Sequence, residues 1–304
     1  MLVSVVIPCY NVEQYISECI ESVLAQTHSE IEIICVDNNS TDNTIGIISE
    51  YARRHPSKIV VEKECKKGAS AARNKGLMIS KGEWIQFLDA DDLLMPTKIE
   101  HQLELIQNKM EAPFVAAACE KQSVDGKKRK VYLTETDAFK GLFTSGLGIT
   151  SANFFKASNV LEIGGWNEAL KSSQEADLMF RLLKINSEIV FDNVPFTIIR
   201  ERNAGQISQV DPNKNWLQYI ELRLQILNYL KTEKNSYFTN QEDFFYQKLF
   251  LQLKRLSKFD IKMAEIYFKM HFEKEFKPHL NPVYNLLYKM FGFKVALRIM
   301  NTFG

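Results

Sequence analysis

The first 120 residues alternate short β-branched runs with apolar residues at helical spacing, and this alternation constrains the fold more than any other feature. Helical patterns occupy residues 16–24, 42–52 and 69–80, and another begins at Pro96. The runs between them predict four buried strands, at Val3–Ile7 (ending at Pro8), Ile31–Val36, Ile59–Val61 and Trp84–Leu88. Four strand–helix units in succession predict an α/β fold, a Rossmann-like, mainly parallel sheet flanked by helices on both faces.

The rest of the chain divides into a mixed part and a helical part. A helix is predicted at Glu175–Ile185, and from Asn213 onward the pattern is almost wholly helical. Short strands are predicted at residues 114–118, 131–133, 151–155, 189–191 and 196–200. We therefore expect a catalytic domain at residues 1–210 and a helical appendage at residues 211–304.

Charge separates the same two parts. Residues 1–210 carry 23 Lys and Arg against 28 Asp and Glu, whereas residues 211–304 carry 15 against 9. The scattered basic residues and the acidic body exclude a nucleic-acid binder. The basic, aromatic end of the chain, with Tyr284, Phe291 and Lys289 among its residues, suits a contact with an acceptor, a membrane surface or a second copy in a homodimer. An ordinary helical bundle that packs on the body fits the same pattern.

Composition excludes several other classes. No apolar run approaches the roughly 20 residues of a transmembrane helix. The chain has five cysteines and no CxxC pair, which argues against a disulfide framework or a zinc ribbon. We expect a reduced, cytoplasmic protein, with any membrane contact peripheral and on the cytoplasmic face.

Polar side chains follow each of the four predicted strands. The segments are Pro8–Asn11, Asp37–Ser40, Lys66–Gly68 with Arg73–Lys75, and Asp89–Asp92. Because ligands of an open parallel sheet bind at the carboxyl ends of its strands, we expect these segments to share one edge. One such segment is typical of a turn or a helix cap, whereas four together predict a binding site.

The residue types at this edge suit a nucleotide with a diphosphate. Tyr10 offers a ring to a base, and Asp37–Asn39 offer polar groups to a base edge and a ribose. Gly68 permits close approach of the backbone, and Arg73 opposes phosphate charge.

Paired carboxylates complete the predicted site. Asp89 and Asp91 are two residues apart at a strand end, so in extended geometry their side chains point the same way. Such a pair beside phosphate suits a shared Mn²⁺ or Mg²⁺ ion.

These segments closely resemble the successive motifs of family 2 glycosyltransferases with the GT-A fold. The matching residues, in order over roughly residues 1–210, are SVVIPCYN (4–11), VDNNSTD (36–42), GASAARNKG (68–76) and FLDADD (87–92). The resemblance implies an inverting hexosyl- or N-acetylhexosaminyltransferase that uses a nucleotide-sugar, most often a UDP-sugar, with Mn²⁺ or Mg²⁺. It implies that Asp91 binds the metal and that Asp89 lies near the ribose. The residues assigned to the nucleotide are Pro8, Tyr10, Asn11, Asp37, Asn38, Asn39, Gly68, Arg73, Asp89 and Ala90.

A later segment, Gly164–Glu168 followed by Gln174–Leu182, resembles the acceptor side of the same family. There an acidic residue at the start of a helix serves as general base, and Glu175 occupies that position. The resemblance also points to Trp166, Asp177 and Arg202 as acceptor or sugar contacts.

The chain departs from the family pattern at several positions. Asn38 stands where the family usually has an Asp that accepts the base N3–H, and Glu175 stands where Asp is commoner. The segment Arg200–Asn203 has no His where some members place one. No QxxRW motif is present, which favours one transfer per binding event over processive synthesis.

Structural alternatives exist for most of these residues. Asp37 is also suited to capping a turn, and Asp91 and Asp92 to capping the following helix, which is the better interpretation for Asp92. Arg73 could instead hold a carboxylate between loops, and Trp166 could stack on a sugar or pack beneath the cleft.

The helix that begins near Gln174 offers two more alternatives. Glu175 suits a helix first turn, where negative charge is favoured. Asp177 and Arg181 are i,i+4 neighbours, and this spacing predicts an ion pair.

Other functions fit less well. A nucleotidylyltransferase needs a glycine-rich loop after the first strand, and a dehalogenase-type phosphatase places its DxD there rather than after the fourth strand. A catalytically inactive sugar-nucleotide-binding or scaffold protein remains the alternative. The sequence favours transfer of one sugar to a hydroxyl of a glycan or lipid-linked glycan during synthesis of a surface polysaccharide or glycoconjugate.

Overall fold

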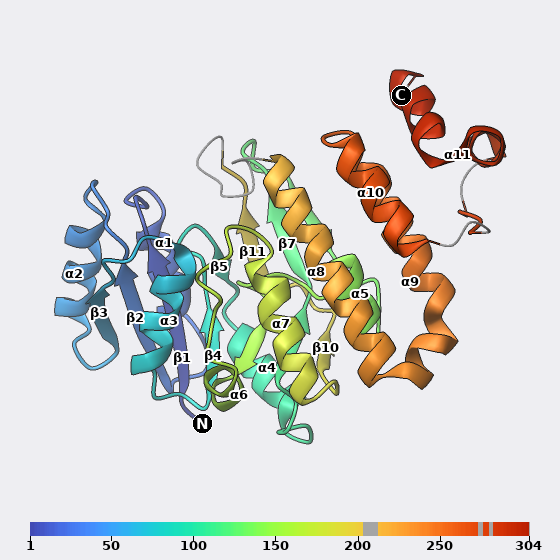
Figure 1. Ribbon diagram of the computed structural model, residues 1–304. Coiled ribbons are helices and arrows are strands. Elements are labelled where there is room, and N and C mark those ends of the chain that lie inside the picture. The colour runs from blue at the N-terminus through green and yellow to red at the C-terminus, as the bar shows by residue number, and fades with distance from the viewer. Residues whose placement is uncertain (203–211, 273–275, 280–281, 304) are drawn as a thin grey trace. The chain divides into compact units, whose positions relative to one another are not determined.

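The computed structural model describes residues 1–202, 212–272, 276–279 and 282–303. The chain forms two compact units, the first from Met1–Leu170 with Gln174–Gly205 and the second from Lys171–Ser173 with Gln206–Gly304. The first unit holds both sheets, and the helices from Pro212 onward belong to the second (Figure 1). The boundary expected at residues 210 and 211 lies outside the described residues.

The first unit is built around a sheet of seven strands among its described residues, in the order β10-β6-β9-β4-β1-β2-β3. β9 runs antiparallel to both of its neighbours, and the other pairs are parallel, so the predicted mainly parallel sheet is confirmed. The strands are β1 (Val3–Cys9), β2 (Ile31–Asp37), β3 (Ile59–Lys63), β4 (Trp84–Phe87), β6 (Phe114–Ala117), β9 (Phe154–Lys156) and β10 (Val190–Asp192).

Helices cover both faces of this sheet (Figure 1). Val3, Val5 and Ile7 of β1 belong to one buried cluster with apolar residues of α1, α2 and α4. On the other face, a Cβ added at Gly76 of α3 would lie 2.4 Å from Val6 Cγ1, so this small residue lets the helix approach the sheet. The helices of this unit are α1 (Ile16–Leu24), α2 (Thr44–Arg54), α3 (Ala69–Ile79), α4 (Lys98–Ile106), α5 (Ala138–Thr144), α6 (Ala157–Glu162) and α7 (Gln174–Ile185).

A second, smaller sheet has the order β5-β11-β7-β8. β11 pairs with β5, so that Ile198 faces Leu93, and this pairing brings the end of β11 beside the segment that follows β4. The strands are β5 (Leu93–Leu94), β7 (Cys119–Gln122), β8 (Lys128–Val131) and β11 (Thr197–Arg200).

β1 continues through Pro8 to Cys9, contrary to the expected end at Pro8. Backbone groups of alternate residues in a parallel strand face opposite neighbours: Val6 O accepts from Leu88, whereas Cys9 O accepts from Asn38 in the loop after β2. Pro8 therefore faces the β4 side, where the β1–β4 pairing has already ended at Val6, and its missing N–H costs no ladder hydrogen bond.

Other boundaries also differ from expectation. β8 begins at Lys128 rather than at Val131, because a charged strand at a sheet edge lacks an apolar pattern. β9 begins at Phe154 rather than at Ser151, α4 begins at Lys98 rather than at Pro96, and β5 and β7 were not predicted.

The second unit contains the predicted C-terminal helices. Its core is aromatic: the ring of Phe250 contacts those of Phe268, Phe272 and Phe293. The helices are α8 (Pro212–Glu233), α9 (Asn235–Leu256), α10 (Ile261–His271) and α11 (Pro282–Phe303), the last broken at Gly292. None of the helices in the described residues combines the length and apolar character that crossing a bilayer requires.

Candidate active site

The ends of β1 and β2 lie side by side because the two strands pair in register from Val3 to Cys9. Tyr10 follows β1 and is 58% exposed, so its ring is available to a ligand. Asn11 has a φ of 50°, and its Oδ1 accepts hydrogen bonds from the backbone N–H (2.8 Å) and the hydroxyl (3.3 Å) of Thr41. Asn11 thus joins the loops that follow the two strands.

Asp37, the last residue of β2, and the two residues that follow it form hydrogen bonds that hold loops. Asp37 is buried, and its Oδ1 accepts from the backbone N–H of Ser40 at 3.3 Å, as expected of a turn cap. Asn38 is also buried and hydrogen bonds to the loop after β3, where its Oδ1 accepts from the backbone N–H of Gly68. Asn39 donates to the carbonyls of Glu64 and Cys65, both at 3.1 Å.

Gly68 introduces α3, which carries Arg73. Its φ of 131° is a conformation that residues with a side chain rarely adopt, although no atom would obstruct a Cβ there. The glycine is therefore needed for backbone conformation rather than for space. Arg73 is buried, and its Nη2 lies 2.6 Å from Asp89 Oδ1, so the expected link between loops is present.

The Asp89–Asp92 segment forms a turn, in which the backbone N–H of Asp92 donates to the carbonyl of Asp89 at 2.9 Å. The extended geometry expected for Asp89 and Asp91 is therefore wrong. Asp92 does not cap α4 either: it is buried, its Oδ1 accepts from the backbone N–H of Arg200 at 3.1 Å, and β5 intervenes before the helix. Ala90, at the centre of the turn, is buried.

Two arginines from the end of β11 hold this turn. Arg202 Nε lies 2.5 Å from Asp91 Oδ2, and the Arg200 side chain donates to the carbonyl of Asp91. Burial, with the neighbouring charge of Asp89, raises the pKa of Asp91, while the Arg202 cation acts in the opposite direction. Burial beside two carboxylates raises the pKa of Asp92 well above its ordinary range.

The donor set fits a divalent ion that is shared with phosphate. In the part of the chain that the structure describes, no three His, Cys, Asp or Glu side chains are gathered so that they could hold a metal ion by themselves. Mg²⁺ commonly takes one or two protein carboxylates and completes its shell with substrate phosphates and water. The crowding of Asp91 by Asp89 is an electrostatic cost that a divalent cation would offset.

Glu175 lies in the first turn of α7, and its carboxyl group is enclosed although the residue as a whole is partly exposed. Its Oε1 is inaccessible to solvent and has no hydrogen-bond partner among the described residues. Burial raises the pKa of Glu175 to about 8, a rise that Asp89 reinforces and that Thr150 and Arg73 oppose. Without a ligand, Glu175 is therefore protonated in most molecules at neutral pH.

The other acceptor-side residues have structural contacts. Asp177 and Arg181 form the predicted i,i+4 ion pair, with Oδ2 and Nη2 2.7 Å apart. Trp166 is 2% exposed, its ring lies edge-on to Phe87, and the Arg73 guanidinium lies 4.5 Å from its centroid. Of the two alternatives for Trp166, packing beneath the cleft is the one the structure supports, because Arg73 and the core cover the ring.

Several contacting residues were missed in the sequence. Thr150 hydrogen bonds to Glu175, Ser151 Oγ accepts from the backbone N–H of Asp89 at 3.1 Å, and Arg200 binds the turn after β4. Arg200 is a cation at a strand end close to the predicted Arg202, and this placement marks the residue as a candidate although it does not reveal its partner. Asn203, in the same segment, lies outside the described residues.

Relatives named as glycosyltransferases or teichoic acid biosynthesis proteins match part of the chain. An uncharacterized glycosyltransferase of Rickettsia typhi is 33% identical over 201 residues, which is 63% of this chain and 61% of that protein. The minor teichoic acid biosynthesis protein GgaB of Bacillus subtilis is 42% identical over 116 residues, 37% of this chain and 13% of that protein. The chain thus spans less than two thirds of the length of either relative.

Solved structures share the fold. TarS of S. aureus, residues 1–349 in complex with UDP-GlcNAc, aligns with a TM-score of 0.66 at 20% identity, over 90% of this chain and 77% of that one. The mannosyltransferase PcManGT of Pyrobaculum calidifontis, in complex with GDP-Man and Mn²⁺, aligns with a TM-score of 0.54 at 15% identity, over 99% of this chain and 86% of that one. The first unit thus has a GT-A type fold, and the helical region follows it.

The sequence profile described as "Glycosyl transferase family 2" matches residues 4–161, just over half of the chain. The match spans the ends of β1, β2 and β4 and stops before Glu175. The chain belongs to glycosyl transferase family 2.

Proposed function

We propose that this chain is a metal-dependent, inverting glycosyltransferase that moves one sugar from a nucleotide-sugar to an acceptor hydroxyl. One observation carries the proposal: Asp89, which follows β4, is paired with Arg73, and the enclosed carboxyl of Glu175 is close enough for the charges of Arg73 and Asp89 to affect its pKa. The proposal is thus supported by a cation, a carboxylate and a general-base candidate whose charges affect one another.

In this proposal, Glu175 takes the proton of the acceptor hydroxyl as its oxygen attacks the anomeric carbon. With a pKa near 8, Glu175 is a stronger base than an ordinary carboxylate, and the fraction that has lost its proton near neutral pH can take the proton of the acceptor. Arg73 positions Asp89 and contributes positive charge beside the departing diphosphate. A single displacement gives inversion.

Asp91 is the residue proposed to hold Mn²⁺ or Mg²⁺, with Asp89 beside it. When bound, the ion supplies Lewis-acid stabilisation of the leaving diphosphate. For Asp91 to bind it, its ion pair with Arg202 must open, and Arg202 then becomes a cation available to phosphate or acceptor.

A UDP-sugar is the proposed donor. The exposed Tyr10 ring offers a stacking surface for a base, and Asp37 lies at the neighbouring strand end. The UDP-GlcNAc complex of TarS supports uridine, and the GDP-Man complex of PcManGT makes guanosine the comparison to include.

The proposed acceptor is a glycan or lipid-linked glycan of a surface polysaccharide or glycoconjugate, handled in the cytoplasm. The name of GgaB, which refers to minor teichoic acid biosynthesis, supports this class. Poly(ribitol phosphate), which appears in the name of a Bacillus spizizenii relative, is a suitable first acceptor to assay beside it.

α11 is the proposed site of peripheral membrane contact. Its exposed apolar residues include Leu286, Met290 and Phe291, and Lys289 beside them is also exposed. An apolar surface flanked by cations suits an anionic bilayer. Co-sedimentation with phosphatidylglycerol vesicles tests this contact, and Met290→Glu should abolish binding to the vesicles. Vesicle binding that persists in this variant would indicate another surface. Dimerisation of the protein without vesicle binding would favour a homodimer contact.

The test of the function is calorimetric titration with UDP, GDP, dTDP and CDP, each with and without Mn²⁺. We expect Mn²⁺-dependent binding of UDP that Asp91→Ala abolishes and that Asp125→Ala, an exposed carboxylate in a hairpin turn, does not. Binding of GDP instead would correct the donor. Failure of all four nucleotides to bind would favour the inactive scaffold protein.

A further inference from the structure

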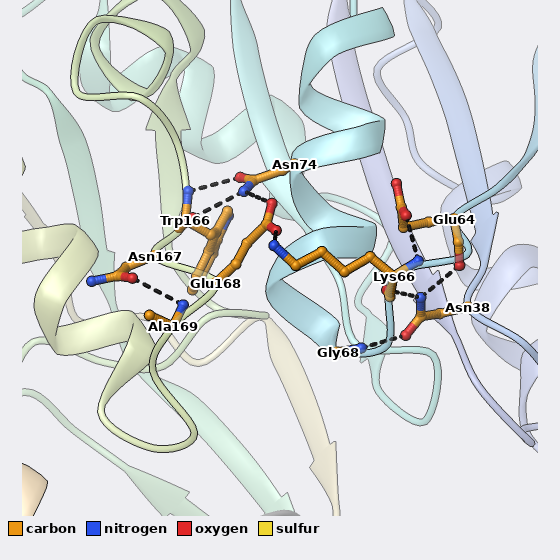
Figure 2. A network of polar contacts seen from close by, with 9 residues as sticks. All are labelled: Asn38, Glu64, Lys66, Gly68, Asn74, Trp166, Asn167, Glu168 and Ala169. Atoms are coloured by element: carbon orange, nitrogen blue, oxygen red, sulfur yellow. Dashed lines mark hydrogen bonds and ion pairs between the residues drawn. The ribbon is translucent and has the colours of Figure 1, made fainter.

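The side chain of Asn38 hydrogen bonds through both its amide nitrogen and its oxygen to the loop of residues 64–68, here called the donor-side loop (Figure 2). Its Nδ2 donates to the carbonyls of Glu64 (2.8 Å) and Lys66 (2.7 Å). Its Oδ1 accepts from the backbone N–H of Gly68 at 2.8 Å. Both amide hydrogens are therefore used within the protein, and the oxygen already has one donor.

The donor-side loop in turn reaches the loop of residues 164–169, here called the acceptor-side loop. Lys66 Nζ lies 2.5 Å from Glu168 Oε2, and Asn74 Nδ2 donates to Glu168 Oε1 at 2.7 Å (Figure 2). Hydrogen bonds from Lys66 and then from Asn74 lower the pKa of Glu168 below its usual range, so the carboxylate stays charged for this contact. The Lys66 side chain is 66% exposed and that of Glu168 is 28% exposed, so the ion pair lies at the surface.

The acceptor-side loop is held on both flanks. Asn74 of α3 accepts from the backbone N–H of Trp166 at 2.8 Å and donates to its carbonyl at 2.9 Å. A Cβ at Gly165 would lie 2.5 Å from Asn74 Oδ1, so only glycine leaves room for this contact. On the other flank, Arg181 of α7 donates to the carbonyl of Gly165 at 2.7 Å. The loop therefore links α3 to the helix that bears Glu175.

We propose that Asn38 is a positioning residue that fixes the donor-side loop, so that Lys66 ties it to Glu168 and transmits nucleotide occupancy to the acceptor-side loop. The contacts that run from Asn38 through Lys66 to Glu168 are here called the tie. The names of the two loops rest on the proposed function, but the tie does not. Its role differs from that expected of Asn38 from family resemblance, in which the residue accepts a hydrogen bond from the base N3–H.

An asparagine is needed at this position because two carbonyl oxygens face its side chain. An aspartate in its place could still accept from Gly68, but its second carboxylate oxygen would lie against the carbonyls of Glu64 and Lys66 with no hydrogen to share. Replacing a donor so that buried oxygens confront each other costs more than losing a hydrogen bond. A base-reading residue would instead tolerate Asp, which accepts as well as Asn does.

Hydrogen–deuterium exchange of the ligand-free protein tests the tie without reference to activity. We expect Asn38→Asp to accelerate amide exchange about tenfold in residues 64–68 and also in residues 164–169. Lys66→Ala should accelerate exchange in residues 164–169, Lys66→Arg should not, and Lys67→Ala is the matched control on the same loop. Acceleration confined to residues 64–68 in Asn38→Asp, or none at all, would overturn the tie.

A second arm measures transmission. UDP with Mn²⁺, at a concentration that saturates each variant, should slow exchange in residues 164–169 of the wild type. This protection should be lost in Lys66→Ala and in Glu168→Gln, and the double variant should lose no more than either single one, because both break one ion pair. Protection that persists in both single variants would overturn the proposal.

The two arms separate this inference from the proposed function. If no nucleotide binds the wild type, the proposed function fails, whereas the ligand-free comparison of Asn38→Asp, Lys66→Ala and Lys67→Ala still reports on the tie. If UDP binds and Asn38→Asp binds it at least as tightly with unchanged exchange, the function stands and Asn38 faces the base instead.

Discussion

Arg73 Nη2 lies 2.6 Å from Asp89 Oδ1, and the Arg73 side chain is only 8% exposed. The same guanidinium also lies over the ring of Trp166, with its Cζ 4.5 Å from the ring centroid. One buried cation thus joins the carboxylate turn after β4 to the acceptor-side loop. A planar group with several donors is suited to this double role, because it stacks and forms ion pairs in different directions.

Arg73→Lys should therefore be damaging although it conserves charge. The lysine side chain cannot stack on Trp166 while holding Asp89, so we expect UDP affinity to fall about tenfold or more and the melting temperature to drop. Calorimetry with UDP and Mn²⁺ and a thermal melt measure the two effects. Lys75→Ala, on the same helix and paired with Glu62, is the control; a wild-type affinity in Arg73→Lys would show that Arg73 acts by charge alone.

Glu175→Gln should remove transfer while leaving donor binding near wild type. The amide keeps the shape and the Thr150 contact but cannot take a proton, so we expect transfer to fall roughly 10²–10⁴-fold. Transfer from UDP-GlcNAc is measured at saturating donor, with Glu162→Gln, an exposed glutamate, as control. Unchanged transfer would move the base to Asp177 or elsewhere.

The same variant should stabilise the protein in a pH-dependent way. The pKa of Glu175 is about 8 in the fold against 4.5 ordinarily, so between these values the folded state holds a proton that the unfolded state has lost. Wild-type stability from this group is complete below pH 4.5 and is lost as pH rises through 8. Glutamine does not titrate, so the melting-temperature advantage of Glu175→Gln should grow from pH 5 to pH 8 and then level off. A constant difference would contradict an enclosed carboxyl.

Local pattern was sufficient to predict the parallel sheet and the polar strand ends, because each depends on residues adjacent in sequence. The structure brings Asn38 to Gly68 and Arg73 to Asp89, as a shared edge requires. The contacts of Arg200 and Arg202 with the turn after β4 were not predictable. They depend on the pairing of β11 with β5, a register between segments about a hundred residues apart that no local pattern encodes.

Two side chains show where residue type alone misleads. Trp166 follows two glycines, a setting that is equally suited to sugar stacking and to burial, and only the position of Arg73 over its ring decides between them. Asn38 has donors and an acceptor for a base edge, but the carbonyls of Glu64 and Lys66 take both donors. The residue type shows which hydrogen bonds and contacts a side chain can form, whereas the fold determines which partner it has.

Lys98→Met should stabilise the protein, most strongly toward neutral pH. Lys98 is fully buried, its Nζ has no hydrogen-bond partner among the described residues, and it lies 5.1 Å from the centroid of the Phe154 ring. Burial lowers the pKa of Lys98 to about 7 from 10.5, with Asp192 opposing the shift.

As pH falls through 10.5, Lys98 takes up a proton in the unfolded state, but in the folded state it does so only near pH 7. The contribution of this group to wild-type stability therefore declines as pH falls from 10.5 to 7. Methionine matches the length without the charge, and its advantage in melting temperature should be small at pH 10, grow as pH falls to 7 and level off below. Lys58→Met, at an exposed position, should show no such trend; an advantage that is independent of pH would mean that folding does not shift the pKa of Lys98.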